Sequence, residues 1–319
     1  MACLQHELIH GALRIIQDTD ELVFWRDREL VRLDSNLHRQ FAVPLHLPLS
    51  RDAPLCSFVL SKHRVAVLGM AAQKASDGLL LFTSLEPSSA TELQTQIVTL
   101  VAPAAALCTN TEQSVLVCAH TDGRVSFVQY PAAGADTRTI VLPDFQSDDR
   151  LMAVHRADPF HIAVSHSGVL WSVDCSTASA HRMLRLDEPA VATCVSPRLN
   201  EHASCPASCL ATVSRSGVRL IRIENERVVA SSMLKLPASW DAQAGVCRQI
   251  LGVIVSTPAG RTVCLCALCP DGSCAVWSAA TGQLVSHFDL PCGPIVRLLG
   301  KHRLSIMGQH GCVHRFPTS

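Results

Sequence analysis

The chain of 319 residues has no excess of charge, because its 27 Lys and Arg residues balance its 27 Asp and Glu residues. It therefore lacks the overall basic character that sequence-independent nucleic-acid binding requires, and such a role would need a local basic patch. No apolar run reaches about 18 residues, so no membrane-spanning helix is expected. Polar residues such as Gln5 and Glu7 stand where a secretory signal would be apolar. We expect an intracellular protein, nuclear or cytoplasmic.

Motifs of known catalytic chemistry are also missing from the sequence. There is no Gly-x-Ser-x-Gly turn, no Gly-x-Gly-x-x-Gly before a helix, and no phosphate-loop spacing upstream of Gly300-Lys301. The adjacent carboxylates Asp148-Asp149 and Asp187-Glu188 stand where solvated loops are expected. We therefore expect no enzymatic activity, no cofactor and no small-molecule substrate.

The fifteen cysteines are an odd number, and in a reducing compartment most should act as small buried hydrophobic residues. The densest group is Cys264, Cys266, Cys269 and Cys274 in TVCLCALCPDGSC. Thiolates at this density can bind zinc. The first two should share one face of a strand whereas the last two flank a turn, and no Cys-x-x-Cys pair recurs elsewhere. We expect core packing and no metal site.

What the sequence does contain is a repeated phrase: an apolar run, a turn with glycine, and a second apolar run. Successive glycines are 39 to 55 residues apart, close to the period of about 40–50 residues for a four-stranded propeller blade. The copies are SDGLLLF around Gly78, TDGRVSF around Gly123, HSGVLW around Gly168, RSGVRLI around Gly217, PDGSCAVW around Gly272 and QHGCVHRF around Gly311. Each copy predicts a β-hairpin, such as strands 115–119 and 125–130 around Asp122-Gly123.

A second marker, proline where the chain passes from one unit to the next, runs in phase with the first. Proline cannot donate to a strand ladder, so it suits the end of an edge strand. It follows leucine at Pro48, Pro143, Pro237 and Pro291, and stands without leucine at Pro103 and Pro189. Long amphipathic helical patterns are nearly absent, and the best candidate, 7–17, reads equally well as a strand.

These patterns predict an all-β protein, a single β-propeller domain over 1–319. Seven four-stranded blades are favoured, with six as the alternative because the first unit has no glycine turn. A strand from residues 1–10 should complete the last blade and leave no open sheet edge. The expected blades are 12–48, 53–103, 104–143, 148–189, 190–237, 245–291, and 294–319 with 1–10.

The six hairpins and their period resemble those of the WD40-like β-propeller superfamily. The sequence departs from that family in that Trp171 and Trp277 are followed by serine, not aspartate, and no Gly-His pair opens a unit. The family ties the strands of a blade with a buried His–Ser/Thr–Asp–Trp network. That network is degenerate here, so the blades should depend more on aliphatic packing.

A closed ring, balanced charge and the lack of catalytic motifs indicate a non-catalytic scaffold, a subunit of a larger multiprotein complex. The resemblance also leaves open a substrate receptor or a nucleic-acid-linked subunit, as in ubiquitin ligation, nuclear transport, RNA processing or DNA repair. An enzyme using the central channel is a less favoured third class. The partners expected are other protein subunits, without direct nucleic-acid contact.

Two loops carry the first candidate partner-binding residues. Trp240 lies outside the strand pattern, and Phe145 stands beside Asp148 and Asp149 in loop 143–150. Aromatic residues in polar loops are favoured as interface anchors, and Trp240 is the first choice. The alternative is that either ring folds back under its own loop.

The last expected blade carries the second group of candidates. Arg297, Lys301 and Arg303 make it the most basic part of the chain. They predict a docking patch for an acidic partner, with an ordinary solvated surface as the alternative.

Overall fold

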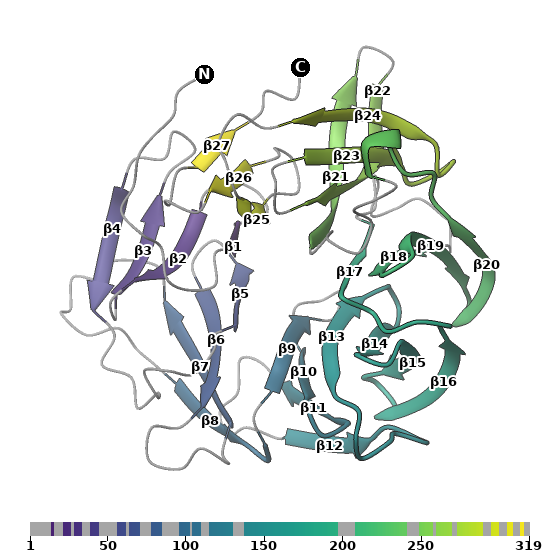
Figure 1. Cartoon of the computed structure of the whole chain (residues 1–319). Coiled ribbons are helices and arrows are strands. Elements are labelled where there is room, and N and C mark those ends of the chain that lie inside the picture. The colour runs from purple at the N-terminus through teal and green to yellow at the C-terminus, as the bar shows by residue number, and fades with distance from the viewer. Residues whose placement is uncertain are drawn as a thin grey trace. The chain divides into compact units, whose positions relative to one another are not determined.

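The structure of the chain is a computed structural model. It describes residues 14–15, 22–26, 29–33, 39–44, 56–61, 64–70, 78–84, 96–102, 104–109, 115–129, 137–196, 208–240, 249–257, 260–269, 273–289, 295–299, 305–308 and 313–315. These residues form antiparallel β-sheets, and the only helical element among them is one 3-10 turn, η1 (Ala238–Trp240). The expected all-β class is confirmed for this part of the chain (Figure 1).

The chain divides into two compact units. The first holds three four-stranded sheets and most of a fourth, each with its strands in chain order. The strands are β1 (Arg14–Ile15), β2 (Leu22–Arg26), β3 (Glu29–Leu33), β4 (Arg39–Pro44), β5 (Cys56–Ser61), β6 (Arg64–Met70), β7 (Gly78–Ser84), β8 (Gln96–Leu100), β9 (Ala104–Thr109), β10 (Val115–His120), β11 (Arg124–Gln129), β12 (Thr137–Val141), β13 (Leu151–Arg156), β14 (His161–Ser165), β15 (Val169–Asp174) and β16 (Ser179–Arg185).

The second unit holds the remaining sheets, again in chain order. Its strands are β17 (Ala192–Val195), β18 (Ser208–Ser214), β19 (Gly217–Glu224), β20 (Arg227–Met233), β21 (Gln249–Thr257), β22 (Gly260–Leu268), β23 (Ser273–Ser278), β24 (Leu284–Asp289), β25 (Ile295–Leu299), β26 (Ser305–Gly308) and β27 (Val313–Arg315). The sheet β25–β27 has three strands in the described residues. Residues 1–10, expected to add the fourth, lie outside them, and of the ambiguous segment 7–17 only Arg14–Ile15 is described, as a strand.

The hairpin predicted around Asp122-Gly123 is confirmed. Strands β10 and β11 pair antiparallel from Val115 opposite Gln129 to Ala119 opposite Val125. Gly123 has a φ of 83°, a conformation that residues with a side chain adopt only at a cost.

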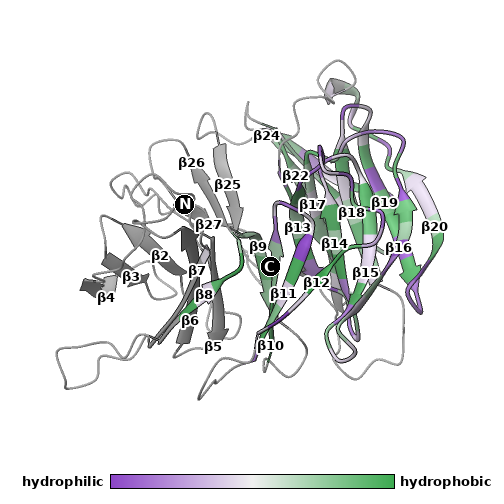
Figure 2. Ribbon diagram, turned by 90° about the horizontal axis from the view of Figure 1, so that it is seen from below, coloured by the Kyte–Doolittle hydropathy of each residue, from purple (hydrophilic) through white to green (hydrophobic). Residues whose placement is uncertain are grey.

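Burial differs between the strands within a sheet. The second and third strands are buried on both faces: every residue of β14 is buried, as are the first five of β15. The fourth strands β12, β16 and β20 are mostly exposed. Figure 2 shows β14 and β15 largely in the hydrophobic colour. Burial on two faces explains why the middle strands read as continuous apolar runs, without strict alternation.

The repeated glycines lie directly against the segment that follows the fourth strand of their own sheet. A Cβ at Gly168 would come within 2.6 Å of the Glu188 carbonyl oxygen and 3.0 Å of the Leu186 Cβ. A Cβ at Gly123 would overlap the ring of Phe145. The equivalent pairs are Gly78 with Ala102 and Gly217 with Leu236. At Gly78, Gly123 and Gly168 a side chain would therefore overlap the segment that covers the hairpin, whereas the contact at Gly217 is looser.

The same covering segment begins with a buried leucine in three sheets. The backbone N–H of Leu142 donates to the Gly123 carbonyl at 3.0 Å, and that of Leu186 donates to the Gly168 carbonyl at 2.9 Å. The N–H of Leu234 donates to the carbonyl of Val218, one residue after the hairpin glycine, at 2.8 Å. The turn glycines and the linker prolines recur in phase along the sequence because the hairpin and the linker that follows the fourth strand are in contact.

Candidate interaction sites

Phe145 lies in the linker between β12 and β13 and is half-buried. Its ring centroid is 5.8 Å from that of Trp171 on β15, with the ring planes tilted by 40°. The other face of the loop is polar, since Asp144 and Asp148 are exposed. The ring is thus partly covered, by Trp171 and Gly123 of the two sheets that the linker joins and not by its own loop as in the alternative. Of the two aspartates predicted with it, Asp148 is exposed.

Asp149 is half-buried and takes part in the turn of this loop. Its backbone N–H donates to the Gln146 carbonyl at 3.0 Å, and its carboxylate accepts the Arg150 N–H at 2.8 Å. These hydrogen bonds hold the loop in place at the start of β13 and leave the Asp148 side chain outward.

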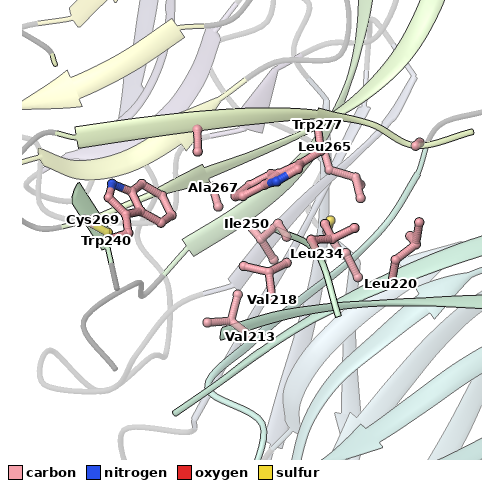
Figure 3. Packing of buried hydrophobic residues seen from close by; sticks show 14 residues of the cluster. Val213, Val218, Leu220, Leu234, Trp240, Ile250, Leu265, Ala267, Cys269 and Trp277 are labelled. Carbon is pink, nitrogen blue, oxygen red and sulfur yellow. The ribbon is translucent and has the colours of Figure 1, made fainter. Parts of the chain in front are cut away.

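Trp240 is not an exposed anchor, which corrects the first of the expected partner contacts. Only 1% of its surface is accessible, and it belongs to an apolar cluster built from β17–β20 and β21–β24 (Figure 3). Its ring meets Trp277 edge-on at a centroid distance of 6.0 Å, and His287 at 6.3 Å. The 3-10 turn η1 directs the indole inward because the apolar area buried by a tryptophan outweighs the polarity of its loop.

Phe145 and Trp240 occupy equivalent positions in two sheets. In each case the aromatic residue lies in the linker before a sheet and packs on the tryptophan of that sheet's third strand. That tryptophan donates its indole N–H to a linker carbonyl, Trp171 to Pro143 and Trp277 to Lys235, both at 2.9 Å. We call this arrangement the linker clamp. The Trp-Ser pairs noted in the sequence thus fasten the chain between successive sheets.

The basic candidates fall in the last part of the chain. Arg297 lies on strand β25, whose side chains are not described, and Lys301 and Arg303 lie outside the described residues. The predicted docking patch for an acidic partner therefore stays a prediction.

The four clustered cysteines are all buried, with 0 to 2% of their surface accessible. The Cys266 and Cys274 sulfurs are 3.2 Å apart on neighbouring strands, and the two residues do not form a disulfide. Cys269 points into the apolar cluster beside Trp240 (Figure 3). Within the described ranges no three His, Cys, Asp or Glu side chains gather as metal ligands would. Burial raises the pKa of the Cys264 thiol, and that of Cys194 to about 12, which disfavours the thiolate that metals bind.

One sheet contains a buried polar chain in addition to its aliphatic core. The His120 Nδ1 lies 2.8 Å from the Ala102 carbonyl, which can only accept, so in the neutral ring Nδ1 carries the proton. The other ring nitrogen, Nε2, then accepts the hydroxyl proton of Ser126 at 2.7 Å, and Ser126 accepts from Thr139 at 2.9 Å. His120 and Ser126 are completely buried, so no substrate can reach them. Together with Thr139 they link β10, β11 and β12. In this sheet, buried hydrogen bonds are therefore present beside the aliphatic packing expected from the sequence.

Three carboxylates in turns and linkers of the described sheets accept structural hydrogen bonds. Burial alone would raise the pKa of Asp122, but the hydrogen bonds from Arg124 bring it below its usual value. The same balance lowers the pKa of Asp174, which accepts from Ser176 and Thr177. The Ser216 N–H lowers the pKa of Glu188. All three pKa values are lowered, as is typical of carboxylates that accept structural hydrogen bonds. A general acid needs a raised pKa, and none of these three groups has one.

Comparison of the sequence with models of known protein families gives no match, and comparison with curated proteins gives none. In the part of the chain that the structure describes, no helix is long and apolar enough to cross a membrane.

Proposed function

We propose that the chain is a closed seven-bladed β-propeller and serves as a non-catalytic scaffold, a subunit of an intracellular multiprotein complex in the nucleus or cytoplasm. The successive four-stranded antiparallel sheets and the recurrent contact between hairpin and linker support a repeat architecture of this kind. Such sheets offer rigid outer strands and loops on which partners can bind.

The observation that carries the proposal is where exposed apolar side chains recur. Among the described residues, four of the six large exposed apolar residues lie on fourth strands: Val141 on β12, Val229 and Met233 on β20, and Val285 on β24, with 69%, 51%, 44% and 62% of their surfaces accessible. Single exposed apolar residues are normal, but these occupy the fourth strand of three repeats. Partner subunits covering the outer strands would bury them.

The test is affinity purification of the full chain from native extract after mild cross-linking, with size determination of the recovered material. Because Trp240 is buried, its substitution would report unfolding, so surface variants are needed. We expect Val141→Lys or Val285→Lys to lower recovery of at least one partner. The shape-matched Val141→Thr and Val285→Thr should retain it. Recovery of the wild-type chain only as a 34.4 kDa monomer would contradict the proposal.

A further inference from the structure

Strand β20 has an open edge, as the other fourth strands do. It pairs with β19 on one side, and no other described strand pairs with it on the other (Figure 1). Its residues 229–233 are all exposed. The fourth strands β12 and β16 carry a charged residue within the strand, Arg138 and Arg182, which is one way in which natural sheets block edge pairing, whereas β24 has Asp289 only at its last position. β20 has only Arg227, at its first position.

The register shows which backbone groups face outward. The Leu234 N–H donates to the Val218 carbonyl, so these two residues form a hydrogen-bonded pair next to the strand. Such pairs alternate along an antiparallel ladder. Ser232 opposite Leu220 therefore points its N–H and C=O toward β19. Ser231 and Met233, at the intervening positions, point theirs away from the sheet.

A bulge sets the length of this edge. Arg222 pairs with Ala230 and Ile223 with Val228, so Val229 has no opposite residue. The regular edge runs from Ala230 to Met233, with two residues whose backbone groups face outward. An extended peptide is the ligand that matches alternating N–H and C=O groups.

Positive charge surrounds the same edge. Arg219 and Arg222 on β19 flank it on opposite faces of the sheet, and Lys235 is exposed just beyond its end. Arg219 Nη1 donates to the Ser231 hydroxyl at 3.3 Å, and its Nη2 lies 3.5 Å from Asp187, a carboxylate whose side chain is 88% exposed. That ion pair is screened by solvent and leaves Arg219 available to another acidic group.

We propose that β20 binds an extended, acidic segment of a partner protein as an added strand. Backbone pairing takes place at Ser231 and Met233, while acidic side chains alternate toward Arg219 and Arg222. A second copy of this chain fits less well, because pairing β20 with itself brings like charges together. The inference rests on the proposed scaffold function and names one surface and the class of partner for it.

Ser231→Pro is the decisive variant. Proline removes the outward N–H of Ser231 while the ladder to β19, which uses Ala230 and Ser232, keeps its donors. Ser231→Ala is the matched control, since it removes the hydroxyl contact with Arg219 but keeps the N–H. Arg219→Gln is a second, independent variant that leaves the backbone edge intact.

The probe is an acetylated, amidated heptapeptide, Val-Glu-Glu-Val-Glu-Glu-Val, in which adjacent Glu side chains point to opposite faces of an added strand. The same peptide with Lys in place of Glu serves for comparison. Binding is followed by fluorescence anisotropy and by amide hydrogen exchange. We expect the acidic peptide to slow exchange at Met233. Ser231→Pro and Arg219→Gln should each weaken binding about tenfold, the worth of one or two hydrogen bonds, and Ser231→Ala should change it less than about twofold. The Lys peptide should bind at least about tenfold more weakly.

Binding that protects other strands, or that is unaffected by Ser231→Pro in a variant with unchanged circular dichroism, overturns the β20 inference. So does equal binding of the two peptides, or dimerisation of the free chain that Ser231→Pro abolishes. The scaffold proposal is judged separately. If the wild-type chain purifies with partners that Ser231→Pro also retains, the scaffold stands and the β20 site fails, whereas a wild-type chain without partners removes the scaffold.

Discussion

The contact between Gly123 and Phe145 allows a quantitative test of how the linker covers the hairpin. In Gly123→Ala the new Cβ would lie 2.8 Å from Phe145 Cε1 and closer still to other ring atoms. The backbone φ of 83° is in addition unfavourable for alanine. The substitution therefore imposes two separate costs, one from the backbone and one from the displaced ring.

The two costs can be estimated separately. Alanine in a left-handed conformation costs about 1–2 kcal/mol. Displacing the ring forfeits its pairing with Trp171, about 0.5–1.5 kcal/mol, and adds strain of about 1–3 kcal/mol. Gly123→Ala should thus lower the free energy of unfolding by about 2.5–6.5 kcal/mol. In a Phe145→Ala background only the backbone cost remains, so the coupling energy should be about 1.5–4.5 kcal/mol.

The assay is urea unfolding at equilibrium of the wild type, both single variants and the double variant. Tryptophan fluorescence and circular dichroism should give coincident transitions, which justifies the two-state free energies. Gly217→Ala in the Phe145→Ala background is the control. The atom nearest to a Cβ at Gly217 is the flexible Leu236 Cδ1 at 3.2 Å, so this glycine should not couple to Phe145. If Gly123→Ala and Phe145→Ala are additive to within about 0.5 kcal/mol, the ring does not cover the glycine and the reasoning fails.

Three further predictions concern burial, strain and charge. Trp240→Ala should destabilise the chain by about 3–5 kcal/mol in urea unfolding, and Trp240→Phe by clearly less; a loss below about 1 kcal/mol would contradict a buried indole. Ala178 has a φ of 52°, so Ala178→Gly should raise the melting temperature, while Ala180→Gly within β16 should lower it; the reverse order would refute the turn geometry. The pKa of Asp174 is lowered in the folded state, so its stabilising effect is full above its unfolded pKa of about 3.8 and is lost as pH falls through the lower folded value. The stability difference between wild type and Asp174→Asn should therefore be greatest near neutral pH and shrink below about pH 4, and a difference independent of pH would exclude this role.

The local repeat was predictable because its signals are short-range. A tight turn needs glycine where φ is positive, and strands need apolar runs. All the signals for one hairpin therefore lie within about twelve residues of sequence. The phase between glycine and linker was also visible, although its cause was not. Only the structure shows that Leu186 and Glu188 lie against Gly168, which makes the two markers one contact.

The candidate anchors were less predictable because exposure is not a local property. Trp240 stands among polar and small residues, as an exposed aromatic residue would, yet it is enclosed by side chains from two sheets. A usable signal was present in part. Trp171 and Trp277 both lie on third strands, and each has an aromatic residue in the preceding linker, which indicates a repeated internal contact.

The sequence by itself determined the β-hairpins, because turn chemistry and strand propensity act between neighbours in the chain. The tertiary structure alone decided which aromatic rings are buried, which cysteines approach one another, and that β20 is left with an open and weakly protected edge. Those outcomes depend on which distant strands and linkers come together, and the free energy of burying a side chain is set by all of its neighbours at once.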